Sequence, residues 1–293
     1  MDSQAPYNGI VTHPGGAHKD EFLACSLLVA RRPVPVFRRE PDAGALEDPQ
    51  TCVVDVGGEH APGRLNFDHH QFPRDQQPTC ALSLVLEHLG LYREAREFCE
   101  WLETTEWFDC RGPVDTADWL GVERDTLARL NSPLDTTLLR RFAAQSEHQP
   151  GEPVWELMRM VGEDLLAYIG GLNERLAAIE QTASFWVLPH EDVELKALFL
   201  PRTDPLPEDP SNGLGRYIER KGLENHVCAL VYPDSRGQGY GLRRFNEHPA
   251  LDFSRLRDLP DVHFTHARGF IAKTTATTPR RLLELLQLAV RRA

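Results

Sequence analysis

The sequence predicts an α/β protein with an N-terminal, mainly parallel sheet flanked by helices, a helical connector and a smaller C-terminal α+β domain. Over the first 90 residues, short apolar segments typical of strands alternate with helical ones, and this alternation indicates a parallel sheet. Helical periodicity then dominates from about 93 to 183, before strand-like segments return. We expect domains at 1–185 and 186–293, with the active cleft between them.

Apolar periodicity and its breaks predict the elements of the first domain. Residues 9–12 form a buried strand, and Pro14 with paired glycines then makes a loop. Apolar residues recur at helical spacing from Asp20 to Arg31, and Pro33 ends this helix. The other expected elements are strands at 34–37, 52–56 and 66–68, and a helix at 81–88 that Thr79 caps and Gly90 ends.

The strongest helical pattern of the chain runs from Trp155 to Ile179. The pair Gly170-Gly171 is expected to break or kink it. Residues 201–210, rich in Pro and Asp, predict an exposed loop, and Pro279 opens a final amphipathic helix. Expected strands of the second domain lie at 185–188, 195–200, 227–232, 240–244 and 263–265.

Composition and charge limit the classes of function. The chain has 293 residues, of which 41% are hydrophobic, which suits two modest domains with a sizeable core. The net charge of −12 disfavours a protein that coats long nucleic acid, because an acidic surface repels phosphate backbones. The N-terminus lacks the features of a signal peptide, and no apolar stretch approaches the roughly 18 residues that span a bilayer.

The cysteines are scattered and form no Cys-x-x-Cys pair. Most lie among apolar neighbours, which favours buried free thiols over disulfides or a zinc site. Free thiols are typical of a reducing cytoplasm, the expected location. The six are Cys25, Cys52, Cys80, Cys99, Cys110 and Cys228.

Metal-binding residue types follow three of the expected strands. His13 follows the first strand, Asp55 ends the third, and the Asp-His-His run at 68–70 follows the fourth. In an open parallel sheet, ligands bind beyond the carboxyl ends of the strands. We therefore expect these groups to converge on one crevice with His18 and Asp20 from the first loop.

The residue types of this set favour a hard divalent cation. Carboxylates and imidazoles without thiolates favour Mn²⁺ or Mg²⁺, although imidazole-rich sites also accept Zn²⁺ and Co²⁺. Several carboxylates without Lys or Arg beside them would repel one another unless cations lay between them. A shared Asp55 would bridge two metals roughly 3.5–4 Å apart, which activate water for attack on phosphorus. The sequence therefore predicts a metal-dependent phosphoesterase.

Each of these residues also has an ordinary structural explanation. His13 or His18 alone is more often a loop or capping histidine. Asp20 alone is a helix-start acid that the helix dipole favours, and Asp55 alone can simply end a strand. Their joint placement at successive strand ends favours the metal site.

Three motifs, at residues 12–25, 53–58 and 67–71, resemble those of the Myg exonuclease family. This family belongs to the Asp-His-His (DHH) phosphoesterase superfamily. The Leu-Asn-Ser-Pro element at 130–133 and the segment 262–271 resemble further elements of the family, so the resemblance extends intermittently over nearly the whole chain.

The resemblance implies a 3′-to-5′ exonuclease that acts on RNA or short single-stranded oligonucleotides and uses two divalent cations, Mn²⁺ or Mg²⁺. His13, His18 and Asp55 would hold one metal. Asp20 and Asp55 would hold the other, completed by an acid from a fourth motif. The expected partner is thus a short nucleic acid, with no membrane, and the protein is a possible homo-oligomer.

The same resemblance assigns roles to further residues. In the Asp-His-His run, Asp68 would anchor the segment, His69 would ligate or support the metals, and His70 would face the scissile phosphate. The substrate-binding residues that it implies are Arg243, His266 and Gly269 in the second domain. Lys19 in the first domain is a further expected substrate-binding residue on its charge alone, which could bind phosphate or simply point into solvent.

This chain departs from the family pattern at three places. Pro14 stands where the family usually has Asn, and Lys19 where it usually has Cys. The fourth motif differs most, and Glu103 or Asp109 could supply its acid, with Asp109 preferred. This leaves two alternatives open: a hydrolase of a small phosphate compound such as a dinucleotide or pyrophosphate, and a catalytically inactive metal- or nucleotide-binding protein.

Overall fold

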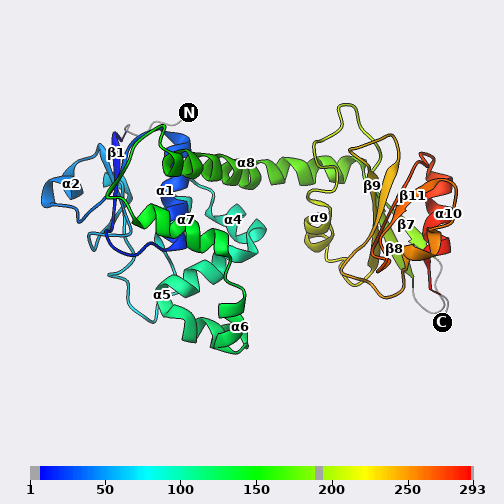
Figure 1. Ribbon diagram of the computed structural model, residues 1–293, viewed down its shortest axis with the longest axis horizontal. Helices are drawn as coiled ribbons and strands as arrows, with labels where there is room; N and C mark the ends of the chain where they lie inside the picture. The colour runs from blue at the N-terminus through cyan, green and yellow to red at the C-terminus, as the bar shows by residue number, and fades with distance from the viewer. Residues whose placement is uncertain (1–6, 189–193, 292–293) are drawn as a thin grey trace. The chain divides into compact units, whose positions relative to one another are not determined.

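The computed structural model describes residues 7–188 and 194–291 and divides the chain into two compact units, Met1–Gly171 and Leu172–Ala293 (Figure 1). Residues 1–6, on which the absence of a signal peptide was judged, lie outside the described residues. Each unit contains a six-stranded sheet with helices against it, which confirms the predicted mixed α/β class. The functional domain boundary expected at 185 stays a prediction.

The sheet of the first unit has the strand order β4-β5-β3-β1-β2-β6. Its four central strands are parallel, and the short edge strands β4 and β6 are antiparallel to their neighbours. The mainly parallel sheet predicted from the alternation of segments is thus confirmed. The strands are β1 (Gly9–Thr12), β2 (Val36–Arg38), β3 (Thr51–Val54), β4 (His60–Ala61), β5 (Asn66–Phe67) and β6 (Glu147–His148).

Helices account for most of the rest of this unit. The first of them, α1 (Lys19–Arg31), matches the predicted helix and ends before Pro33. Helix α3 (Ala81–His88) also matches, but its N-cap is Cys80, whereas the Thr79 hydroxyl donates to the Gln77 carbonyl. The other helices are α2 (Ala43–Glu47), α4 (Tyr92–Phe98), α5 (Glu100–Leu120), α6 (Arg124–Arg129), α7 (Pro133–Ala143), α8 (Pro153–Thr182) and the 3₁₀ turn η1 (Pro62–Arg64).

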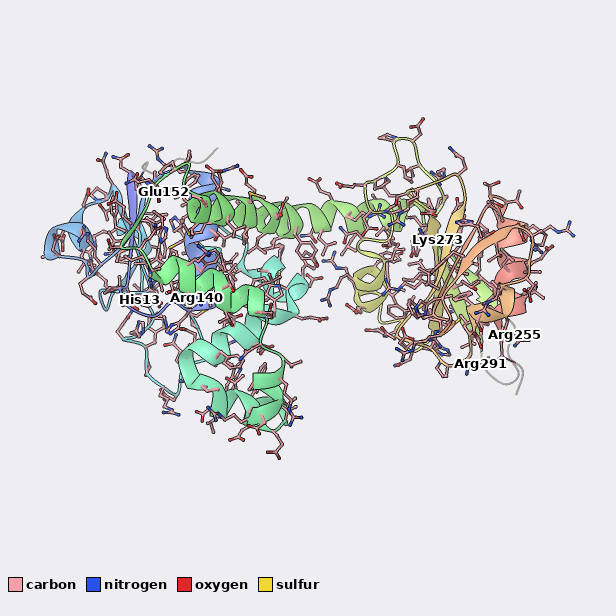
Figure 2. All side chains as sticks on the ribbon, viewed as in Figure 1. His13, Arg140, Glu152, Arg255, Lys273 and Arg291 are labelled. Atoms are coloured by element: carbon pink, nitrogen blue, oxygen red, sulfur yellow. The ribbon has the colours of Figure 1, made fainter. Side chains whose placement is uncertain are left out.

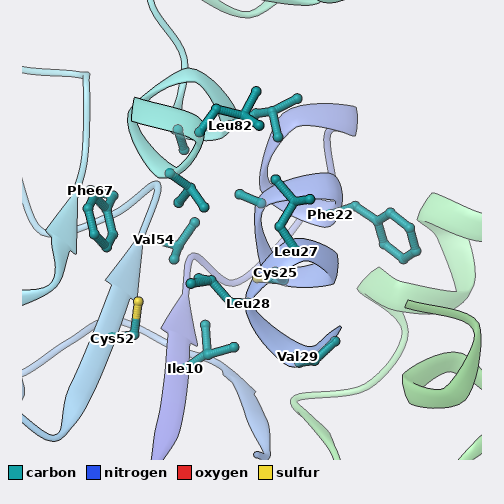
Figure 3. Close-up of a cluster of buried hydrophobic side chains, with 14 of the residues drawn as sticks. Ile10, Phe22, Cys25, Leu27, Leu28, Val29, Cys52, Val54, Phe67 and Leu82 are labelled. Carbon is teal, nitrogen blue, oxygen red and sulfur yellow. The ribbon is translucent and has the colours of Figure 1, made fainter. Parts of the chain in front are cut away.

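The core of the first unit lies between the sheet and helices α1 and α3 (Figure 3). Ile10 and Val54 project from neighbouring strands, and Leu27 and Leu28 meet them from α1. These side chains are at most 2% exposed. Burial of each such side chain stabilises the fold by about 1.5–3 kcal/mol. This packing fixes the positions of the strands and therefore of the residues that directly follow them.

Helix α8 packs unusually closely on α1. A Cβ at Gly162 would lie 2.0 Å from the Ser26 carbonyl oxygen and 2.8 Å from the Ala30 Cβ. The same helix is fixed to the sheet by Trp155, whose indole donates to the Val34 carbonyl at 2.8 Å. It continues unbroken through Gly170, so the break expected at the glycine pair is absent.

We expect Gly162→Ala to destabilise the first unit by about 1–3 kcal/mol, because the added methyl group forces α8 away from α1. The measurement is urea unfolding followed by circular dichroism. Gly170→Ala is the matched control, since no described atom lies within 4 Å of its Cβ position. That variant should be more stable by about 0.5–1 kcal/mol, the usual gain from Gly to Ala in a helix. If both substitutions changed the free energy of unfolding by the same amount, the close packing of α8 on α1 would be contradicted.

The sheet of the second unit has the order β11-β12-β10-β9-β8-β7. Strands β8 and β9 are parallel and the other pairs are antiparallel. Helix α10 (Pro279–Ala289) buries Leu282, Leu285 and Leu286 in the core of this unit. The remaining elements are β7 (Ser184–Leu188), β8 (Leu195–Phe199), α9 (Leu214–Arg220), β9 (Val227–Pro233), β10 (Tyr240–Arg244), η2 (Phe253–Leu256), β11 (Val262–Thr265) and β12 (Ile271–Thr274).

Five strands of this unit were predicted, and β12 was missed because its polar residues hide the apolar alternation. Thr274 is fully buried, and its hydroxyl donates to the Asp261 carbonyl. Lys273 (Figure 2) pairs with Asp234 at 2.8 Å. These partners allow polar residues to stand inside a sheet.

The cysteines and the helices were also expected to have particular properties, namely free thiols and no membrane span. All six cysteines are free in the described part of the chain, five of them buried and Cys110 partly so, as predicted. None of the described helices is long and apolar enough to cross a membrane.

Candidate metal centre

Strand order brings the three sequence motifs together. Strands β5, β3 and β1 are direct neighbours and parallel, so their carboxyl ends meet at one edge of the sheet. His13 (Figure 2) follows β1, Asp55 follows β3, and Asp68 follows β5. The side chains of the motifs therefore gather at one place, where open parallel sheets bind ligands.

Asp55 is the centre of this cluster. It is 1% exposed, and its backbone has a φ of 60°, a left-handed conformation that Asp tolerates better than most residues. Its amide donates to the Phe67 carbonyl at 3.0 Å, which continues the pairing of β3 with β5. One carboxylate oxygen lies 3.4 Å from the His13 Nε2 atom, and the other lies 3.1 Å from the His69 Nε2 atom.

Asp68 holds the conformation of the Asp-His-His run. Its carboxylate accepts hydrogen bonds from the Gly58 amide at 2.6 Å, from the His70 amide at 3.1 Å and from the His70 ring at 2.6 Å. Burial alone would raise the pKa of Asp68, but these hydrogen bonds lower it to about 2. Asp68 therefore stays ionised and orients His70, whose side chain is 63% exposed.

His69 lies between two carboxylates. Its Nε2 atom is 2.8 Å from Asp109 and 3.1 Å from Asp55, and its Nδ1 atom is 3.8 Å from the Cys110 sulfur. Burial alone would lower the pKa of His69, but the bonds to Asp109 and Asp55 raise it to about 12. A proton thus partly balances the negative charge, and a metal ion at this place would have to displace it.

The carboxylates around His69 repel one another. Asp20 is 1% exposed, and burial, followed by the charges of Asp55 and Asp109, raises its pKa well above the usual value. One ligand atom from each of Asp20, Asp55, His69 and Asp109 lies within 4.8 Å of the others. The N-terminus of α3 gives partial relief, since the Ala81 amide donates to Asp20 at 3.3 Å.

A second group of ligand atoms shares Asp55 and contains a residue that the sequence did not reveal. It consists of His13, His18, Glu21 and Asp55, again within 4.8 Å. Glu21 is fully buried, and it accepts the His18 amide at 2.7 Å and lies 3.2 Å from the His13 ring. In the sequence Glu21 is simply a second acid beside Asp20 in the first turn of the expected helix. Its spacing of three residues from His18 is that of a capping box, and this was the available signal.

Arg38 fixes the loop that carries both histidines. Its guanidinium, 3% exposed, donates to the carbonyls of Gly15 at 3.1 Å and Gly16 at 3.0 Å. It also lies 3.5 Å from Glu21 and stacks 4.6 Å above the Phe142 ring. A residue of β2 thereby holds the loop between β1 and α1 in one conformation.

We expect Arg38→Met to weaken Mn²⁺ binding by about 10–100-fold, as is usual when a group that orients metal ligands is lost. Isothermal titration calorimetry measures the affinity. The neighbouring Arg39 is exposed, and the one described hydrogen bond of its side chain goes to the Glu40 carbonyl, so Arg39→Met should bind Mn²⁺ like the wild type. Unchanged affinity in Arg38→Met would show that the loop needs no such support.

The two candidates for the fourth-motif acid lie in different surroundings. Asp109 lies in the cluster beside His69, and 3.7 Å from His18. The alternative, Glu103, pairs instead with Arg96 at 3.0 Å and is nearly half exposed. Both come from α5, but only Asp109 reaches the metal-binding groups.

The residues present fit a divalent cation. Within the described part of the chain, four buried polar atoms of the cluster have no hydrogen bond of normal geometry, although charged groups lie nearby. Buried polar atoms are rarely left this way in folded proteins. Oxygen and imidazole ligands of this kind suit Mn²⁺ or Mg²⁺. The four atoms are His13 Nε2, Asp20 Oδ1, Glu21 Oε1 and Asp109 Oδ2.

The expected substrate-binding residues are less clearly placed. Lys19 pairs with Asp135 at 3.0 Å. In the second unit, the ring of His266 lies 4.1 Å from that of Phe270. Gly269 has a φ of 68°, and a Cβ there would lie 2.0 Å from the Asp252 carboxylate, so the fold itself requires glycine. The binding roles of these residues and of Arg243 on β10 stay predictions.

Two hollows flank the cluster within the first unit. A small one of about 150 Å³ is lined by residues that include His69, His70, Asp109 and Arg111. A larger one of about 780 Å³ begins at His18, Asp20 and Asp109. Asp109 borders both.

Comparison with known proteins agrees with the motifs. Residues 9–89 match the MYG1_exonuc family, described as an uncharacterised protein family (UPF0160). The resemblance to the MYG1 exonuclease family is confirmed over this segment. It contains β1, α1, β3, β5 and α3, and so all the predicted ligands except Asp109.

Individual relatives match a similar length. MYG1 exonuclease from Rattus norvegicus is 48% identical over 69 residues, and that from Homo sapiens is 46% identical over 67 residues. The MYG1 protein of Dictyostelium discoideum is 40% identical over 67 residues. Each match covers 21% of this chain and 16%, 17% and 19%, respectively, of the relative. The similarity to these relatives therefore concerns the segment that carries most of the candidate ligands.

Among solved structures, the DHH domain of a protein described as a member of a family of ribosomal proteins aligns with a TM-score of 0.36 and 15% identity. The alignment covers 98% of this chain and 88% of that one.

Proposed function

We propose that this protein is a metal-dependent phosphodiesterase, a 3′-to-5′ exonuclease that acts on RNA or short single-stranded oligonucleotides with two divalent cations. The observation that carries the proposal is a pair of candidate ligand groups, each gathered within 4.8 Å, that share the buried Asp55. The names of the MYG1 exonuclease relatives, matched over the same segment, support the nuclease activity.

The ligand sets divide between two cations, Mn²⁺ or Mg²⁺. His13, His18, Glu21 and Asp55 would hold one, and Asp20, Asp55, His69 and Asp109 the other. When bound, such cations activate a water molecule and neutralise charge that develops on the phosphate. Asp55 would contribute a ligand to both cations.

His70 would meet the substrate phosphate. Asp68 binds its Nδ1 atom at 2.6 Å and raises its pKa, so the ring is cationic over a wider pH range than a free histidine. The side chain is exposed, which leaves its other nitrogen to donate to a phosphate oxygen. Asp68 therefore acts through His70.

Of the alternatives, hydrolysis of a small phosphate compound is favoured by one observation. The hollow of about 150 Å³ beside His70 lies below the range of about 300–1,000 Å³ usual for small-ligand sites, which suits a phosphate group better than a larger ligand. The inactive binding protein was considered because the fourth motif diverges, and the position of Asp109 beside His69 supports catalysis instead. A cytoplasmic location, in keeping with the free thiols, and a homo-oligomer stay predictions.

The test is hydrolysis of short, 5′-labelled RNA and DNA strands with added Mn²⁺, beside a sample with excess chelator. We expect stepwise shortening from the 3′ end that the chelator abolishes, with the faster strand showing which sugar is preferred. Cleavage of pyrophosphate or a dinucleotide without cleavage of either strand would contradict the exonuclease and support the small-phosphate alternative.

A further inference from the structure

The hollow of about 780 Å³ is a groove with a polar end and an apolar end. The polar end is formed by His18, Asp20 and Asp109 of the metal cluster. From there it extends between α1, α5, α6 and α7, all in the first unit. Its apolar walls are Trp101, Phe108, Leu120, Leu127, Leu130 and Leu139.

Four of these six side chains, those of Trp101, Phe108, Leu120 and Leu130, are exposed, whereas Leu127 is buried and Leu139 is partly buried. Trp101 and Phe108 are each 37% exposed, and Leu130 is 75% exposed. Trp101 and Phe108 are seven residues apart on α5, so they lie on the same face of the helix. Nearby Trp107, by contrast, stacks on Trp119 with ring centroids 4.9 Å apart. The two groove aromatics show no such stacking within the described part of the chain, and each is partly exposed where it lines the groove.

The charges of the groove are those of a site for a single nucleotide. Apart from the cluster, its ionisable residues are Lys19 and Asp135, which neutralise each other at 3.0 Å. A track for a polynucleotide backbone needs a row of cations. Polar groups that can bond to the edge of a base are present, among them Thr104, Asn131 and Ser132.

We propose that this groove binds the nucleoside adjoining the scissile phosphate, with its base against Trp101 and Phe108. This inference rests on the proposed phosphodiesterase function and specifies its substrate, because it requires a planar, apolar group attached to the phosphate. The volume lies within the range of about 300–1,000 Å³ usual for small-ligand sites. Continuity with the metal cluster places such a group directly beside the phosphate.

The test compares two probes that differ only in the base, adenosine 5′-monophosphate and ribose 5-phosphate. Titration calorimetry with Mn²⁺ present measures their affinities. We expect the wild type to bind the adenosine compound about tenfold or more tightly, since stacking of one base contributes that much. Trp101→Ala and Phe108→Ala should each remove most of this difference and leave the affinity for ribose 5-phosphate unchanged.

Two variants separate stacking from general loss of apolar surface. Phe108→Leu keeps the apolar volume and loses the ring, so it should behave like Phe108→Ala. Leu134→Ala is the matched control, because Leu134 is 79% exposed, lies on α7 and does not line the groove. It should retain the full preference for the adenosine compound.

The outcomes for the groove and for the enzyme are distinguishable. Equal binding of both probes by the wild type would overturn the groove proposal, whatever the nuclease assay shows. The groove proposal would also be overturned if the wild type, Trp101→Ala and Phe108→Ala all cleaved an oligonucleotide with the same KM. If no strand is cleaved but the preference for the base is present and lost in these variants, the groove proposal stands and the exonuclease does not.

Discussion

Asp55→Asn is expected to lower phosphodiester hydrolysis about a thousandfold while leaving the fold intact. Both ligand groups share Asp55, so the substitution weakens both cation sites at once. Bound cations contribute several kcal/mol to transition-state stabilisation, and each 1.4 kcal/mol or so is a factor of ten in rate. Hydrolysis of a labelled oligonucleotide at saturating Mn²⁺ measures the loss.

Asn is the right substitute because of the backbone at this position. Asp55 has a φ of 60°, and Asn is one of the few other residues that adopt this conformation readily. Its amide keeps the volume of the carboxylate, so circular dichroism and the unfolding midpoint should change little. Full turnover in a folded Asp55→Asn variant would contradict the shared-ligand arrangement.

Asp109→Asn and Glu103→Gln should differ sharply, although both remove a negative charge from α5. We expect the first to lower hydrolysis about a hundredfold, because Asp109 lies 2.8 Å from His69 and belongs to one ligand group. The second should keep near-normal activity, since it loses only a partly exposed ion pair with Arg96, worth at most about 1 kcal/mol. Initial rates with Mn²⁺ measure both.

The reverse pattern, with Glu103→Gln inactive and Asp109→Asn active, would show that the fourth-motif acid has been placed wrongly. Loss of activity in both would instead mean that the geometry of α5 as a whole is required. Unfolding curves of the two variants separate this second case from loss of a ligand.

Much of the candidate site could be predicted because it depends on local rules. The residues after β1, β3 and β5 are identified by the ends of apolar segments, and parallel strands bring such ends together. Asp109 was harder, since it lies on a helix some forty residues after the Asp-His-His run, where spacing carries little information. The resemblance left two candidates there, and only tertiary structure separates Asp109 from Glu103.

Other features could not be predicted because they depend on partners distant in the chain. Glu21 looks like any acid at a helix start, and its contact with Arg38 of β2 becomes visible only when β1 and β2 pair. The groove is similar, since Trp101 and Leu130 come from separate elements. Nothing in the sequence around Gly162 indicates its close contact with Ser26. Strand β12 was missed for the same kind of reason, because its polar residues have tertiary partners.

Titration of the protein with Mn²⁺, read out by calorimetry beside Asp55→Asn, tests the two-cation centre most directly. We expect two ions per chain in the wild type, with proton release because His69 must give up its proton to bind metal. In Asp55→Asn both sites should weaken together. Binding of no ion, or identical binding in wild type and variant, would contradict a metal centre built around Asp55.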